Sequence, residues 1–159
     1  MTPSTKSAKP SRKGFTLVEI IVVVTIIGLM ASIAIPTFIQ SRQNSKAART
    51  ANDFRLFAEK FEIYNLGAGE WPEDGYPATV PSGMEELLLK GTWTKPSAIG
   101  GLWDYDFNAF GFTAGVSIHG ATASNETILA VDRLLDDGNL SSGRLRDVGD
   151  NHISFILEE

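Results

Sequence analysis

The chain has 159 residues, 43% of them hydrophobic and 21% charged, which allows one compact domain and an additional segment. Four of its fourteen basic residues precede Gly14, so the chain after Gly14 carries ten basic and nineteen acidic residues, a net charge of −9. An acidic body repels phosphate backbones, so we expect no nucleic-acid binding. The absence of cysteine excludes a disulfide framework, a thiol nucleophile and a Cys-ligated zinc site.

An apolar run follows the basic N-terminal segment. From Phe15 to Ile39 the only charged residue is Glu19, and a hydrocarbon core needs about 20 helical residues to be crossed. We therefore expect a single-pass membrane protein, transmembrane to about residue 39. By the positive-inside rule, the N-terminus stays in the cytoplasm because of four basic residues: Lys6, Lys9, Arg12 and Lys13.

An ordinary secretory signal peptide is the alternative, because Ser32-Ile33-Ala34 would be accepted as a small-residue cleavage site. The chain would then be a secreted soluble enzyme or carbohydrate-binding protein. Against this reading, the apolar run is longer than the usual h-region of about 7–15 residues. An acid within such a run is also costly unless it is protonated or paired.

A helical pattern continues beyond the apolar run. Apolar or small residues recur three and four positions apart from Ala47 to Tyr64, with charged residues between them. The helix is predicted to span 15–66, because Gly67 and Gly69 end it. Its second half is expected to pack on the C-terminal body through an aromatic stripe: Phe54, Phe57, Phe61 and Tyr64.

Residues 67–159 form the predicted globular domain. A short helix is predicted from Met84 to Lys90, capped by Ser82 and ended by Gly91. Strands are predicted at 102–108 and 110–118, joined as a hairpin near Gly111, and at 153–157. Residues 128–135 favour a short helix, although 127–131 can also be a strand. The predicted fold class is α+β, a long N-terminal α-helix packed on a small antiparallel β-sheet.

Two histidines and three tryptophans are further candidates for chemistry. His119 and His152 have no nucleophile elbow, phosphate loop or ligand spacing beside them, so both are interpreted as surface or strand-end residues. Trp71, Trp93 and Trp103 could line a sugar site, but a sheet this small needs large side chains for its core. We therefore predict that the protein is not an enzyme.

The segment from Lys13 to Glu19, KGFTLVE, resembles the class III signal of type IV pilins and type II secretion pseudopilins. It joins a basic leader, Gly14, Phe15, a glutamate four positions later and a long apolar helix. The resemblance implies that 1–14 is a leader, which prepilin peptidase removes between Gly14 and Phe15, and that the new Phe15 amine is methylated. It also implies a pilin-like fold, anchored in the inner membrane with its C-terminal domain in the periplasm.

Glu19 is expected to drive assembly. After cleavage, the Phe15 amine of a neighbouring copy can reach the Glu19 carboxylate, and in a low-dielectric bundle this pair is favoured over two isolated ions. The alternative is an incidental acid near a helix start, stabilised by the helix dipole. Gly28 and Pro36 weaken the helix, and in the resembling filaments this stretch loses helicity on assembly. Ordinary transmembrane use of glycine and proline explains them almost equally well.

The resemblance to major pseudopilins also implies a C-terminal loop, 132–150, that binds calcium. A solvated turn rich in aspartate and glycine explains the same residues. The chain departs from the usual pattern, because it has Gly101-Leu102-Trp103-Asp104 where that family has Asp-Pro-Trp-Gly. Oxygen ligands of the kind that calcium prefers would come from five residues: Asp132, Asp136, Asp137, Asn139 and Asp150.

The expected function is therefore structural. We predict a subunit of a type IV pilus-like filament, first of all a type II secretion pseudopilin. It would assemble with copies of itself and with minor pilins on an inner-membrane platform. The alternative is a true pilin for adhesion, motility or DNA uptake.

Overall fold

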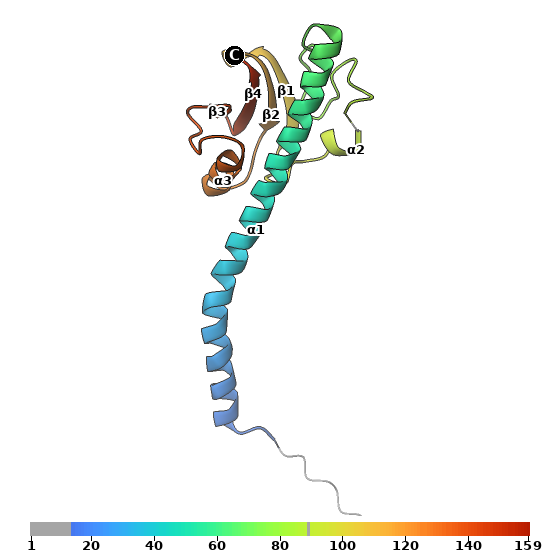
Figure 1. The fold of residues 1–159 in the computed structure, drawn as a ribbon. Coiled ribbons are helices and arrows are strands. Elements are labelled where there is room, and N and C mark those ends of the chain that lie inside the picture. Colours follow the sequence, from blue (N-terminus) through green and yellow to red (C-terminus); the bar gives the residue numbers. More distant parts are fainter. Residues whose placement is uncertain (1–13, 89) are drawn as a thin grey trace, which may run out of the picture. The chain divides into compact units, whose positions relative to one another are not determined.

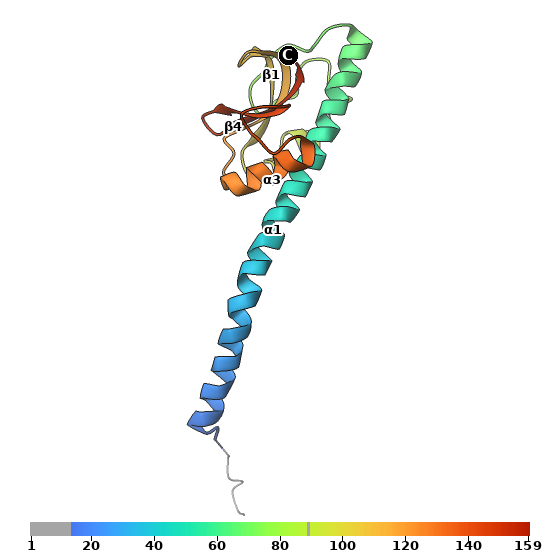
Figure 2. The same ribbon diagram turned by 60° about the vertical axis from the view of Figure 1, so that its left-hand side comes forward.

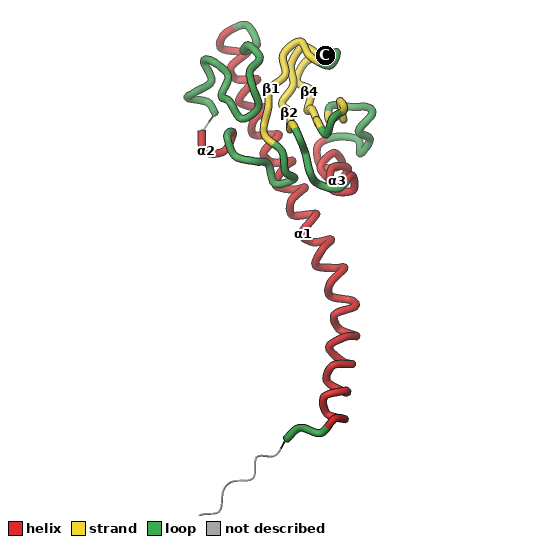
Figure 3. The backbone as a smooth tube through the Cα atoms, turned by 180° about the vertical axis from the view of Figure 1, so that it is seen from behind, coloured by secondary structure: helices red, strands yellow, loops and turns green. Residues whose placement is uncertain are grey.

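The computed structural model describes residues 14–88 and 90–159, so most of the predicted leader lies outside the described residues. The chain divides into two compact units, one ending at Ile39 and the other running from Gln40 to Glu159. Both units contain part of one helix, α1, Leu17–Ala68 (Figure 3). The second unit also contains a sheet and two shorter helices.

Helix α1 confirms the predicted long helix with bounds shifted by two residues at each end. It continues through Gly28, Pro36 and Gly67, so Gly67 does not end it as predicted. The end comes at Gly69, whose φ of 79° favours glycine and whose amide donates to the Asn65 carbonyl at 2.8 Å. By length and composition, α1 is the one helix among the described residues that could cross a membrane.

The core of the second unit forms between α1 and the sheet (Figure 2). Phe57 meets the rings of Trp93 and Trp103 edge-on at 5.0 and 4.8 Å, and Phe61 stacks on Tyr105 at 4.3 Å. Burying each such ring contributes about 1.5–3 kcal/mol. Trp93 and Trp103 are thus core residues, as predicted, and Trp71 is half-buried. The α1 residues buried in this core are Ala47, Thr50, Ala51, Phe54, Phe57, Ala58 and Phe61.

Four antiparallel strands lie in the order β1-β2-β4-β3 (Figure 1). The first two, β1 (Leu102–Ala109) and β2 (Phe112–His119), form the predicted hairpin. Its two turn residues, Phe110 and Gly111, both have positive φ, as a type I′ turn requires. The strand predicted at 153–157 is β4 (His152–Glu158), whereas β3 (Leu145–Gly149) was not predicted.

The predicted helix from Met84 to Lys90 is wrong. Residues 82–88 form turns, and the four-residue helix α2, Lys90–Trp93, begins where the predicted helix should end and includes Gly91. The buried side chains of Met84, Leu88 and Trp93 explain this path, because each must reach the core. In the 127–135 region the helical alternative is correct, since α3 spans Asn125–Leu135.

Candidate functional site

The predicted cleavage site lies ahead of α1. Gly14, Phe15 and Thr16 have no regular secondary structure and are exposed. A side chain added at Gly14 would meet nothing within 4 Å. The peptide between Gly14 and Phe15 is therefore accessible, while the predicted basic residues of the leader lie outside the described residues.

Thr16 and Glu19 form a capping box at the start of α1. Glu19 Oε2 accepts hydrogen bonds from the Thr16 amide and hydroxyl, both at 2.8 Å, and the Glu19 amide donates to Thr16 Oγ1 at 3.2 Å. This reciprocal pair satisfies backbone donors that a helix start otherwise leaves unpaired. The sequence analysis missed the role of Thr16, although the pattern Thr16-Leu17-Val18-Glu19 before an apolar run is its signal.

The first half of α1 exposes its apolar side chains. Every large hydrophobic residue from Phe15 to Ile39 is at least half exposed within this chain. Monomeric soluble proteins rarely present apolar patches of more than a few hundred Å². This segment therefore favours an apolar environment that the described residues do not provide.

Three carboxylates meet at the C-terminal end of α3. Asp132 lies in its last turn, Asp136 caps it and Asp137 follows, and one ligand oxygen of each lies within 4.8 Å of the others. Asp136 accepts from the amide of Arg144, and Asp137 accepts from Ser142 Oγ at 2.9 Å. The structure thus brings together three of the five predicted calcium ligands.

Asp132 is fully buried, and neither carboxylate oxygen has a hydrogen-bond partner among the described residues. Burial, together with the charges of Asp137 and Asp136, raises the pKa of Asp132 to about 6. The nearby backbone amides of Gly138 and Asn139 lower this pKa in part, although neither forms a hydrogen bond with the Asp132 carboxylate. A bound cation would supply the missing partner.

The other two predicted ligands are placed differently. Asn139 follows Asp137 in the same loop, where its amide donates to Asp137 Oδ1 at 2.8 Å and its Oδ1 accepts from Ser141. Asp150 lies in the turn between β3 and β4, with a φ of 51°, and is not part of the three-carboxylate group.

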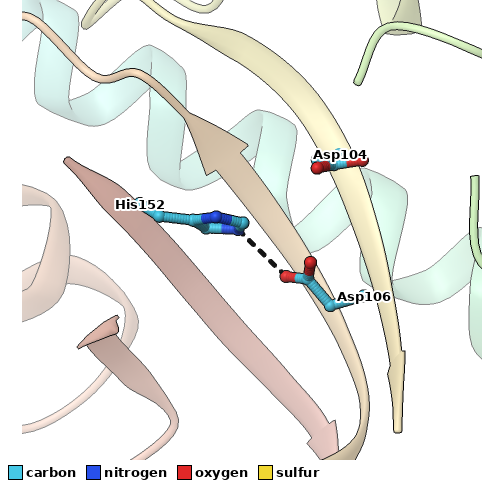
Figure 4. Close-up of side chains that lie close together, drawn as sticks. All are labelled: Asp104, Asp106 and His152. Atoms are coloured by element: carbon cyan, nitrogen blue, oxygen red, sulfur yellow. Dashed lines mark hydrogen bonds and ion pairs between the residues drawn. The ribbon is translucent and has the colours of Figure 1, made fainter. Parts of the chain in front are cut away.

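A second polar cluster lies on the sheet, where Asp104 and Asp106 of β1 approach His152 of β4 (Figure 4). His152 Nε2 is 3.0 Å from Asp106 Oδ2. His152 and His119 are both strand-end residues, as predicted, but His152 is buried rather than on the surface. The cluster could not be predicted from the sequence because it joins Asp106 and His152, which are 46 residues apart in the chain.

The N-terminal segment matches a known family model. Residues 9–35 match the model of the prokaryotic N-terminal methylation motif. This match includes the predicted cleavage site, Glu19 and most of the exposed apolar segment. The N-terminal part of the chain therefore carries a prepilin-type methylation motif.

The relatives that the chain resembles include type II secretion core proteins and a type IV pilin. The chain is 28% identical over 89 residues to a type II secretion system core protein G of Klebsiella michiganensis, covering 56% of this chain and 55% of that protein. It is 34% identical over 88 residues to the type IV major pilin PilE1 of Neisseria gonorrhoeae, covering 53% and 50%. A core protein G of Vibrio cholerae is 29% identical over 83 residues, covering 52% and 53%.

The chain thus spans about half the length of the curated relatives it matches. These relatives are named as pilins and secretion-system core proteins. No solved structure matches the chain.

Proposed function

We propose that the chain is a subunit of a pilus-like filament, made as a membrane-anchored precursor, and that it serves as a type II secretion pseudopilin. The observation that carries the proposal is the exposed apolar half of α1, which follows a prepilin motif and contains one carboxylate. Such a helix is stabilised when it inserts into a bilayer. It is stabilised further when copies pack together and exclude lipid.

Processing would create the second group needed for assembly. Prepilin peptidase would cut between Gly14 and Phe15, leaving a methylated amine on Phe15. The accessible peptide at this position supports the step. The precursor would span the inner membrane once, with its C-terminal unit in the periplasm.

Glu19 would pair with the Phe15 amine of a neighbouring copy. Both capping hydrogen bonds of its carboxylate involve Oε2, and among the described residues none reaches Oε1. One oxygen can therefore hold the helix start while the other accepts from the neighbour's ammonium group. A pair in a low-dielectric bundle removes the cost of two unpaired buried ions.

Two substitutions separate the charge of Glu19 from its capping role. Glu19→Gln keeps the capping hydrogen bonds, since glutamine serves at this position of a capping box, but removes the charge. Glu19→Ala removes both. We expect both variants to be cleaved and inserted, and both to yield at least tenfold fewer filaments than wild type, measured by electron microscopy of sheared or membrane-extracted fibres.

Mass spectrometry of the mature N-terminus provides the control. Methylated Phe15 in all three proteins would show that processing is intact. Normal filament yield from Glu19→Gln alongside loss in Glu19→Ala would contradict charge pairing and leave capping as the role of Glu19. A mature chain beginning at Ile35 would contradict the whole proposal.

The same strains distinguish a pseudopilin from the alternative, a true pilin for adhesion, motility or DNA uptake. The alternative is supported by the identity to PilE1. Retention of exported proteins in the periplasm of the Glu19→Gln strain supports the pseudopilin. Loss of surface fibres with normal export supports the pilin.

We also propose that Asp132, Asp136 and Asp137 bind calcium, with Asn139 as a neighbouring oxygen donor. The supporting observation is the buried carboxylate of Asp132, which lacks a partner among the described residues. An all-oxygen set of this kind suits a hard cation. Calcium would stabilise the conformation of the loop after α3 rather than take part in a reaction.

A further inference from the structure

The sheet face opposite α1 carries a buried polar cluster that the filament function does not use. Side chains alternate along a strand, so when Trp103 and Tyr105 of β1 point at α1, Asp104 and Asp106 point to the other face. On that face Asp104 is 7% exposed, and Asp106 and His152 are 5% exposed. The outer face of a small antiparallel sheet is usually solvated, so this burial needs a cause.

One aromatic residue of the hairpin packs against the cluster, and a second lies beside the first. The ring of Phe110 lies 4.9 Å from that of His152, and Phe112 packs where Gly115 has no side chain. Phe110 is 55% exposed and has a φ of 52°, which is unfavourable for a bulky residue. A large side chain is thus held in a strained turn above the cluster.

The hydrogen bonds converge on one carboxylate oxygen. Asp106 Oδ2 lies 3.0 Å from His152 Nε2 and 3.3 Å from Ser154 Oγ, and it also accepts from Ser117 Oγ. The two serine hydroxyls are 2.8 Å apart. Asp106 is therefore well held, and its position relative to His152 is fixed.

The cluster has more acid than base. Burial, together with the charge of Asp106, raises the pKa of Asp104 to about 6. Among the described residues, the side-chain charges that act on Asp104 are those of Asp106, His152 and Asp74, with no lysine or arginine. Two buried carboxylates beside one imidazole lack a full counter-charge, which is costly in a low-dielectric site.

We propose that Asp104, Asp106 and the Nε2 atom of His152 bind a divalent ion of the zinc class, which joins β1 to β4 across β2. One ligand atom from each residue lies within 4.8 Å of the others. Zinc bonds of about 2.0–2.2 Å in a tetrahedron place ligand atoms about 3.3 Å apart. The 3.0 Å between Asp106 and His152 already suits this geometry, and Asp104 needs to approach by no more than about 1.5 Å.

His119 supplies the outer contact that such a site needs. Its Nδ1 atom lies 3.4 Å from His152 Nδ1. When Nε2 of a histidine binds a metal, the other ring nitrogen carries the proton and donates it to an acceptor, which fixes the tautomer and the ring. Nδ1 of His119 is such an acceptor when the His119 ring carries its proton on Nε2. The imidazole nitrogen favours zinc over calcium, in contrast to the all-oxygen cluster at Asp132.

The test uses the full chain in detergent, stripped with EDTA and titrated with ZnCl₂ or CaCl₂. We expect this site to bind one zinc ion per chain and to raise the Tm, because an ion that binds the folded state stabilises it. Calcium should not compete for it. Asp104→Asn, which is nearly isosteric, should weaken zinc binding at least tenfold, whereas Asp132→Asn and Asp150→Asn should leave it unchanged.

A spectroscopic measurement keeps the proposal falsifiable if Asp104→Asn folds poorly. In wild type, zinc should shift the ¹⁵N resonance of His152 Nε2 and leave the proton on Nδ1. Zinc binding by Asp104→Asn with wild-type affinity would overturn the assignment, as would an unchanged His152 ring. Loss of binding in His119→Ala but not in Asp104→Asn would place the ion between the two histidines and would also overturn it.

Discussion

Residues 17–39 and 40–68 of α1 continue one helix, but their side chains have different surroundings. The second half buries seven residues in the core of its own unit. The first half exposes a nearly continuous apolar surface and keeps one acid at its start. The second half is therefore stabilised by packing within a single chain. The first half is stabilised by contact with lipid or with other copies.

The largest expected difference comes from removing an aromatic ring in each half. Phe61 is fully buried against Tyr105 and Trp93, so Phe61→Ala should lower the free energy of unfolding of the C-terminal unit by about 3–5 kcal/mol. Phe38→Ala, its control in the exposed half, should leave that free energy unchanged. Chemical denaturation in detergent, followed by tryptophan fluorescence, measures both. Equal losses of free energy of unfolding in Phe61→Ala and Phe38→Ala would contradict the distinction between the two halves of α1.

A charge introduced into each half should give the opposite ranking. Ile27→Lys places a lysine within the apolar segment and should oppose membrane integration by about 3 kcal/mol. Ile63→Lys, on an exposed part of the second half, should not affect integration. The fraction of protein that resists carbonate extraction from membranes reports the result. A fully integrated Ile27→Lys protein would contradict a spanning role for this segment.

The smallest expected effect concerns the acidic loop after α3, where the Asp132 carboxylate has no hydrogen-bond partner among the described residues. Asp132→Asn removes a buried charge and should raise the free energy of unfolding by about 1–3 kcal/mol in chelator. With calcium the order should reverse, because wild type gains binding energy that the variant lacks. Thermal unfolding with and without calcium measures this. The same difference under both conditions would indicate a turn without an ion.

Asp150→Asn serves as the control for the loop. Asp150 lies in the β3–β4 turn, apart from the three carboxylates. Asp150→Asn should therefore leave the free energy of unfolding unchanged, both in chelator and with calcium. A calcium-dependent loss in Asp150→Asn would extend the site to the larger ligand set expected from sequence.

Local patterns made α1 and the β1–β2 hairpin predictable. The spacing of apolar residues from Ala47 to Tyr64 defines one helical face, and the Gly111 turn joins two alternating strands. By contrast, β3 has one buried residue, Leu145, and is defined by its pairing with β4. Pairing between distant segments is not visible in a local pattern.

The candidate sites follow the same division. The prepilin motif is contiguous and was readable in full, and the carboxylates near Asp132 are close in sequence. The cluster of Asp104, Asp106 and His152 arises from the register of three strands, and His152 was expected to be a surface or strand-end residue. Phe110 packs against His152 and Phe112 against Phe110, and the positions of both rings follow from the turn.

The capping box lies wholly on the Phe15 side of the predicted cleavage site. All its hydrogen bonds join Thr16 and Glu19, and none involves Gly14. If the leader is trimmed ahead of Phe15, the first helical turn keeps every bond that defines it. Maturation can then change the charge at the tip of the helix without refolding it, so the same rod serves before and after the cut.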